Sequence, residues 1–128
     1  MKVVKDYPPN FEKIKAVFPV RDNTVYTYRD VIFAPKVDFD LPDDLIAHES
    51  VHMLQQGEDP AGWWDLYLVD PEFRFRQELE AYKVQYKAYL KSGHRDQFQF
   101  LLTIARDLSG ELYGNMTSLS EAIKLIKS

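Results

Sequence analysis

The stretch HESVH at residues 48–52 decides how the rest of this chain is interpreted. In a helix, His48 and His52 lie one turn apart on the same face, so both imidazoles can reach one metal ion. Glu49 follows the first histidine, and its carboxylate borders that face. The pattern H-E-x-x-H on a helix is typical of a zinc site in which two histidines bind the ion and the glutamate is the general base for a bound water.

The segment around the motif, Leu41–Gly57, has the ends of a helix. Asp40 is a candidate N-cap, Pro42 suits the first turn, and Gly57 follows the last turn. The alternative interpretation is a buried or surface helix whose histidines are merely polar. The side of the helix away from the motif predicts a core face, made of Ile46, Ala47, Ser50, Met53 and Leu54.

Length and composition limit the classes of protein to consider. The chain has 128 residues, 45% of them hydrophobic, which predicts one domain spanning residues 1–128 with a real core. The net charge of -4 argues against nucleic acid or an anionic membrane as a partner. No cysteine is present, so any metal ligands must be histidines and carboxylates. No signal-peptide-like or membrane-spanning apolar run occurs, so a cytoplasmic protein is expected.

The rest of the chain reads as one short β region and several helices. Thr24–Ala34 is rich in β-branched and aromatic residues, and Arg29-Asp30 either turns it into a hairpin or lies within one long strand. Trp63 and Trp64 follow a loop; one of them lines a cleft, or both cover the core from a loop or short helix. Helices are predicted at residues 11–17, 71–92 and 96–108 and after Ser118, where Glu121 completes a capping box.

A catalytic zinc site needs a third protein ligand. His94 is the only other histidine, and its place just past a helix end indicates an exposed turn residue. Glu78 lies on the apolar stripe of the predicted helix 71–92, whereas Glu80 lies on its charged, solvated side. A carboxylate on an inward face is costly unless it is paired or metal-bound, so Glu78 is the better candidate. The alternative for Glu78 is a buried acid paired with Arg74 or with a backbone donor.

With these residues in place, the chain resembles the zincin metallopeptidases, and among them the small gluzincin-like proteins. In that group a glutamate on a later helix completes the site and is followed by a small residue and then Asp; here Glu78 and Ala81 match, and Tyr82 replaces the Asp. Another partner must therefore orient the ligand histidine. The segments TYRDVIFAP, LIAHESVHMLQQ and FRQELEAYKVQY also look like small metallopeptidase-like proteins of phages and bacteria, a likeness that spans Thr24–Tyr86.

The resemblance implies an α+β fold, with a small antiparallel sheet or hairpin packed on the motif helix and three further helices. It also implies that an edge strand within Thr24–Phe33 lays out a peptide substrate by β-addition. If the chain is encoded by a phage, the resemblance places it in the host cytoplasm or the virion. The oligomeric state stays open.

These observations predict a zinc-dependent metallopeptidase acting on a peptide or protein. Zn²⁺ would be bound by His48, His52 and Glu78, with Glu49 as general base. Three tyrosines are candidates to stabilise the oxyanion: Tyr113, which is favoured because glycines flank its loop, Tyr82 and Tyr86. The alternatives are hydrolysis of another amide, a peptidase that is latent until it meets one partner, and a non-catalytic zinc-binding or structural module, phage-associated or not, with a degenerate site.

Overall fold

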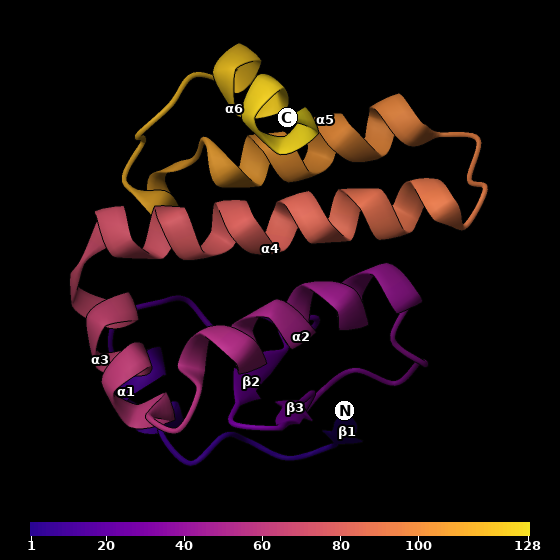
Figure 1. The fold of residues 1–128 in the computed structure, drawn as a ribbon. Helices are drawn as coiled ribbons and strands as arrows, with labels where there is room; N and C mark the ends of the chain where they lie inside the picture. Colours follow the sequence, from indigo (N-terminus) through magenta and orange to yellow (C-terminus); the bar gives the residue numbers. More distant parts are fainter.

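Helix α2 (Asp43–Gln56) packs against helix α4 (Pro71–Lys91), and this pair forms the centre of the fold (Figure 1). The computed structural model describes all residues from 1 to 128. A small sheet lies on the far side of α2, and the C-terminal helices lie on the far side of α4. The α+β prediction is confirmed. The remaining elements are β1 (Lys2–Val4), α1 (Phe11–Lys15), β2 (Tyr26–Tyr28), β3 (Val31–Phe33), α3 (Pro60–Val69), α5 (Gln97–Leu108), the 3₁₀ turn η1 (Glu111–Tyr113) and α6 (Leu119–Lys127).

The sheet has three strands in the order β1-β3-β2. Strands β2 and β3 form the predicted hairpin, with Tyr28 opposite Val31 and Arg29 in the turn at φ 59°. Strand β1 pairs with β3 in parallel, with Lys2 opposite Val31, so the sheet is mixed where an antiparallel one was expected. A parallel pair joins segments that are far apart in the chain, so no local sequence signal predicts it.

Helix starts follow the capping signals with two exceptions, α2 and α3. Helix α3 begins at Pro60, where a loop was expected, and the Asp59 side chain caps it by accepting a hydrogen bond from the amide of Gly62. The Asp70 side chain accepts hydrogen bonds from the amides of Glu72 and Phe73, and α4 begins there as predicted. The predicted start of α2 at Leu41 is wrong, because α2 begins at Asp43 with an extended Pro42 in the N-cap position. The helical backbone conformation is disfavoured for a residue that precedes proline, so the helix does not begin at Leu41.

Two hydrophobic cores lie on either side of the α2–α4 contact. The first core joins α1, β2 and α3. It includes Trp63 and Trp64, which both come from α3, and this agrees with the sequence alternative in which both cover the core. The second joins α4, α5, η1 and α6. Its buried members are Tyr82, Leu101, Ile104, Ala105, Leu108, Tyr113, Ala122 and Ile126.

The buried face of α2 is the motif face, so the predicted apolar core face is wrong. Leu54 is 76% exposed, and of the buried residues of α2 only Val51 is apolar. The other five are polar, and each has partners on α4, on the sheet or within α2. Because most of those partners come from the sheet or from α4, hydrophobicity alone predicted the wrong side of the helix as buried. The buried polar residues of α2 are Asp44, His48, Glu49, His52 and Gln56.

None of the helices combines the length and the apolar character that crossing a bilayer requires.

Candidate metal centre

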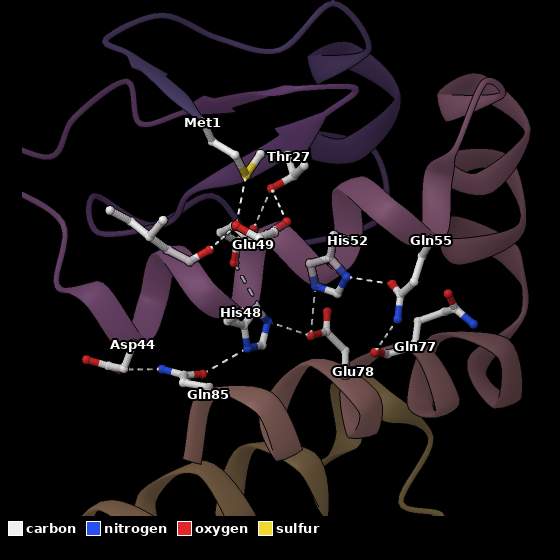
Figure 2. Close-up of polar contacts among 12 residues, drawn as sticks. Met1, Thr27, Asp44, His48, Glu49, His52, Gln55, Gln77, Glu78 and Gln85 are labelled. Atoms are coloured by element: carbon white, nitrogen blue, oxygen red, sulfur yellow. Dashed lines mark hydrogen bonds and ion pairs between the residues drawn. The ribbon is translucent and has the colours of Figure 1, made fainter. Parts of the chain in front are cut away.

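His48 and His52 on α2 face Glu78 on α4 across the contact between the two helices (Figure 2). The Oε1 atom of Glu78 lies 2.9 Å from Nε2 of His48 and 3.2 Å from Nε2 of His52. One potential ligand atom from each residue lies within 4.8 Å of the other two. All three side chains are buried. Two imidazoles and one carboxylate that converge in this way could hold a metal ion.

A chain of hydrogen bonds fixes the tautomer of His48. The Asp44 carboxylate only accepts hydrogen bonds, so Gln85 turns its Nε2 toward Asp44 Oδ2 at 2.9 Å. Its amide oxygen then faces Nδ1 of His48 at 2.8 Å (Figure 2). Because that oxygen also only accepts, the network assigns the proton to Nδ1. The lone pair of Nε2 is left free to bind a metal ion, the arrangement typical of ligand histidines.

His52 is fixed by a second amide in the same manner. Gln55 donates from Nε2 to the carbonyl oxygen of Gln77 at 3.0 Å, which turns its own Oε1 toward Nδ1 of His52 at 2.8 Å. The proton of a neutral His52 is thereby assigned to Nδ1, and Nε2 again points at Glu78. These amides take the orienting role that the resemblance assigns to an acid at the position of Tyr82, whose ring packs edge-on against His48.

The centre of the triad requires a positive charge. With both imidazoles neutral, two nitrogen lone pairs would face one carboxylate oxygen, which is repulsive unless a cation lies between them. Without a metal, a proton fills this role. Burial alone would lower the pKa of His52, but the charge of Glu78 and the hydrogen bond to it raise that pKa to about 9. Burial likewise raises the pKa of Glu78, yet His52 and His48 hold it well below its usual range.

The second oxygen of Glu78 has its own donor, the hydroxyl of Tyr67 on α3. The Tyr67 hydroxyl keeps its proton, because burial and the charge of Glu78 raise its pKa well above the ordinary value. The alternative in which Glu78 pairs with Arg74 is wrong: Arg74 donates to main-chain carbonyls and forms no ion pair with Glu78. Sequence reasoning missed Tyr67, because nothing local links α3 to a ligand on α4.

The sheet holds Glu49 beside the triad. Its Oε1 accepts a hydrogen bond from the Thr27 hydroxyl on β2 at 2.9 Å, and its Oε2 lies 3.7 Å from Nε2 of His48. Glu49 is only 6% exposed, and Thr27 is 2% exposed. A carboxylate held next to the position of a bound cation has the placement that a general base requires. Thr27 is a further residue that the sequence did not single out.

A cleft of about 1020 Å³ opens onto this group of residues. The triad, Glu49 and Tyr67 line one part of it, and most residues between Val17 and Thr27 line another. Tyr113 and Tyr82, two of the proposed oxyanion donors, also line the cleft. Burial raises the pKa of both well above the ordinary value, so both hydroxyls are protonated. Tyr86, the third, packs against the second core and does not line the cleft.

The two weaker ligand candidates lie outside the triad. His94 is exposed and stacks on the ring of Tyr89, with the ring centroids 4.0 Å apart. Glu80 is exposed on the solvent side of α4.

The edge of β2 that faces α2 is partly occupied. The Thr27 carbonyl accepts hydrogen bonds from Gln56 Nε2 at 2.8 Å and from Trp64 Nε1 at 2.9 Å, and the amide of Arg29 donates to Gln56 Oε1 at 2.7 Å. The side-chain amide of Gln56 thus pairs with this edge as another strand would. Val25 lies two residues earlier, lines the cleft, and makes no main-chain hydrogen bond.

Comparisons with protein-family models, with curated proteins and with solved structures find no match to this chain.

Proposed function

We propose that this protein is a zinc-dependent metallopeptidase that hydrolyses peptide bonds in the cleft beside His48, His52 and Glu78. One observation carries the proposal: both imidazoles are held with Nδ1 protonated and Nε2 directed at the Glu78 carboxylate, in a buried site. In the metal-free protein a proton on His52 must take the place of the cation between the imidazoles and Glu78. Glu49, a fourth group that a purely structural site does not need, lies next to it.

The ligand chemistry favours zinc among common cations. Two imidazole nitrogens and one carboxylate oxygen are a usual set for catalytic zinc, which keeps a fourth position open. Mg²⁺ and Ca²⁺ prefer sites made of oxygen ligands alone. The cleft that reaches the triad leaves room for a water or substrate at that open position. Bound there, zinc would act as a Lewis acid that acidifies water and polarises a carbonyl.

Glu49 supplies the proton transfers of the proposed reaction. Its Oε2 accepts a proton from the attacking water and then returns it to the amine that leaves when the C–N bond breaks. Thr27 holds the other oxygen, Oε1, so the carboxylate keeps one orientation throughout. Gln85 and Gln55 accept the Nδ1 protons of His48 and His52, so both rings keep Nε2 directed at the metal position.

Tyr113 is the proposed donor to the oxyanion that forms on the substrate carbonyl, with Tyr82 as the other candidate. Both line the cleft, and their raised pKa values keep a proton available to donate. A peptide substrate is supported by Val25, which lines the cleft and makes no main-chain hydrogen bond, so that an extended chain bound there could pair with it.

The second candidate function is a non-catalytic zinc module. The triad joins α2 to α4, the two helices at the centre of the fold, so a bound ion would also cross-link the domain. This reading explains the ligands and the amides that orient them, but it gives no role to Glu49.

Metal analysis and peptide hydrolysis on the same variants separate these functions. Purified protein is expected to bind one zinc ion per chain and to cleave casein or a complex peptide mixture, with activity lost on chelation and restored by zinc. Glu49→Gln should keep the metal and lose hydrolysis, whereas His52→Ala should lose both. Glu80→Gln, an exposed change on α4, is the matched control and should retain both. Hydrolysis by metal-loaded Glu49→Gln would remove Glu49 from the mechanism, and zinc binding without any hydrolysis by the wild type would favour the structural module.

A further inference from the structure

Arg74 on α4 is a buried cation without an acidic partner. Its side chain is 7% exposed, and its Nε and Nη1 atoms donate to the main-chain carbonyls of Leu112, Tyr67 and Leu68. Nη2 makes no hydrogen bond within the protein, and it is not among the polar atoms sealed from solvent. Carbonyl oxygens satisfy the other donors, and the guanidinium carbon lies 4.9 Å from the ring centroid of Phe18 and 5.9 Å from that of Tyr67, but no carboxylate neutralises the charge.

Arg74 lines the same cleft as the proposed metal centre, and two further arginines line it with Arg74. Arg21 comes from the segment after α1, and Arg106 comes from α5. None of the ion pairs in the protein involves any of the three, although Asp107 and Glu111 also line the cleft; Arg21 and Arg106 are exposed. Burial raises the pKa of Asp107 and the charge of Arg21 lowers it, so this carboxylate lies within electrostatic reach of Arg21 but forms no ion pair with it.

The geometry points to a subsite that binds a carboxylate of the peptide substrate, formed by Arg74 together with Arg21 and Arg106. A guanidinium presents a planar set of donors that matches the two oxygens of a carboxylate, and such bonds are stronger than bonds between neutral groups. This inference rests on the proposed peptidase function. It adds a substrate class: peptides with a carboxylate near the bond that is cleaved, supplied either by the C-terminus or by an Asp or Glu side chain.

Three metal-directed ligands test the subsite and separate the two sources of carboxylate. Each is a short peptide analogue with an N-terminal hydroxamate, which binds zinc, and the three differ only at the other end. The first ends in a free C-terminal carboxylate, the second in a carboxamide, and the third carries an aspartyl side chain before a carboxamide. Calorimetry with zinc-loaded protein gives the affinity of each. We expect the first or the third to bind at least about tenfold more tightly than the second, the effect of one charge-assisted pair.

Variants connect that preference to the arginines. Arg106→Gln and Arg21→Gln should reduce the preference for the carboxylate ligand while leaving the affinity for the carboxamide ligand unchanged. Arg95→Gln, an exposed change outside the cleft, is the control and should preserve the preference. Arg74 also holds main-chain carbonyls, so it is tested as Arg74→Lys, which keeps the charge but loses the planar pair of donors, with circular dichroism to verify the fold.

The outcomes distinguish the subsite from the proposed function. Equal affinity for all three ligands would overturn the subsite and leave the metal centre standing. A preference that survives in both Arg21→Gln and Arg106→Gln and in a folded Arg74→Lys would also overturn it. If none of the ligands binds zinc-loaded protein, the cleft does not accept a metal-directed peptide, and the function and the subsite are both wrong.

Discussion

The amide oxygen of Gln85 lies 2.8 Å from Nδ1 of His48, and this contact determines which nitrogen of the imidazole faces Glu78. Gln85 is held in turn by Asp44, which accepts a hydrogen bond from its Nε2. A ligand on one helix is therefore oriented from a second helix by an uncharged amide rather than by a carboxylate. The amide fixes the tautomer without adding negative charge next to the site.

Replacing Gln85 with leucine should weaken zinc binding about 10-fold to 100-fold, because the Nδ1 proton of His48 loses its acceptor and the ring its orientation. Competition with a fluorescent chelator measures the affinity. Gln99→Leu, an exposed change on α5, controls for the added apolar surface. Unchanged affinity in a folded Gln85→Leu protein would show that the contact has no part in metal binding.

The stability of the metal-free protein should fall as pH rises above about 6.5. The pKa of His52 is raised from 6.5 to about 9, so its stabilising contribution is complete below 6.5 and is lost as pH rises through 9. The pKa of Glu78 is lowered from 4.5, so its contribution is present above 4.5 and is lost as pH falls further. Metal-free protein should thus be most stable between 4.5 and 6.5.

Urea denaturation with chelator, repeated across this pH range, measures the effect. His52→Gln should remove the decrease between pH 6.5 and 9, and the difference between the two proteins isolates His52 from other titrating groups. Zinc affinity should increase over the same range, because the metal displaces a proton from His52. A wild-type stability that follows the His52→Gln curve would contradict the assigned charge state.

Tyr67→Phe should destabilise the metal-free protein by about 1–3 kcal/mol, because the second carboxylate oxygen of Glu78 would stay buried without a donor. Chemical denaturation measures the change in the free energy of unfolding. Tyr7→Phe is a matched removal of a hydroxyl at a residue that is 40% exposed, and it should have little effect. Equal stability of the two variants would mean that water replaces the Tyr67 hydroxyl at no cost.

Leu108→Ala should lower the free energy of unfolding by about 2–5 kcal/mol, because Leu108 has no exposed surface in the second core and its truncation leaves a cavity. Leu54→Ala removes the same atoms from a side chain that is 76% exposed, and its effect should stay within about 0.5 kcal/mol. A small decrease in the free energy of unfolding for Leu108→Ala would indicate that α5 and α6 move together and fill the cavity.

Local signals in the sequence predicted much of the fold. Asp70 before Pro71 marks the start of α4, because capping depends on neighbouring residues. A tight turn depends on neighbouring residues too, and Arg29-Asp30 divides the β region into a hairpin. Strand β1 was not predicted, because its pairing with β3 joins segments about thirty residues apart. The spacing of His48 and His52 and the position of Glu78 on the inward stripe of α4 also led to the candidate site.

The partners of the candidate site were beyond the reach of sequence patterns. Thr27, Tyr67 and Gln85 are ordinary residues of a strand and two helices, and only the fold brings them to Glu49, Glu78 and His48. The buried side of α2 was misjudged because its polar groups have partners that hydrophobicity does not reveal, on the sheet, on α4 and within α2 itself.

Glu78 and Gln85 are seven residues apart on α4, which is close to two full turns, so one straight helix sets both the metal-facing carboxylate and the amide that orients His48. The helix therefore fixes both the distance and the angle between these two residues. Inserting or deleting a single residue between them would rotate one by about 100° relative to the other, and no adjustment of side chains could restore both contacts. This segment of the chain should therefore tolerate exchange of its outward residues but no change in length.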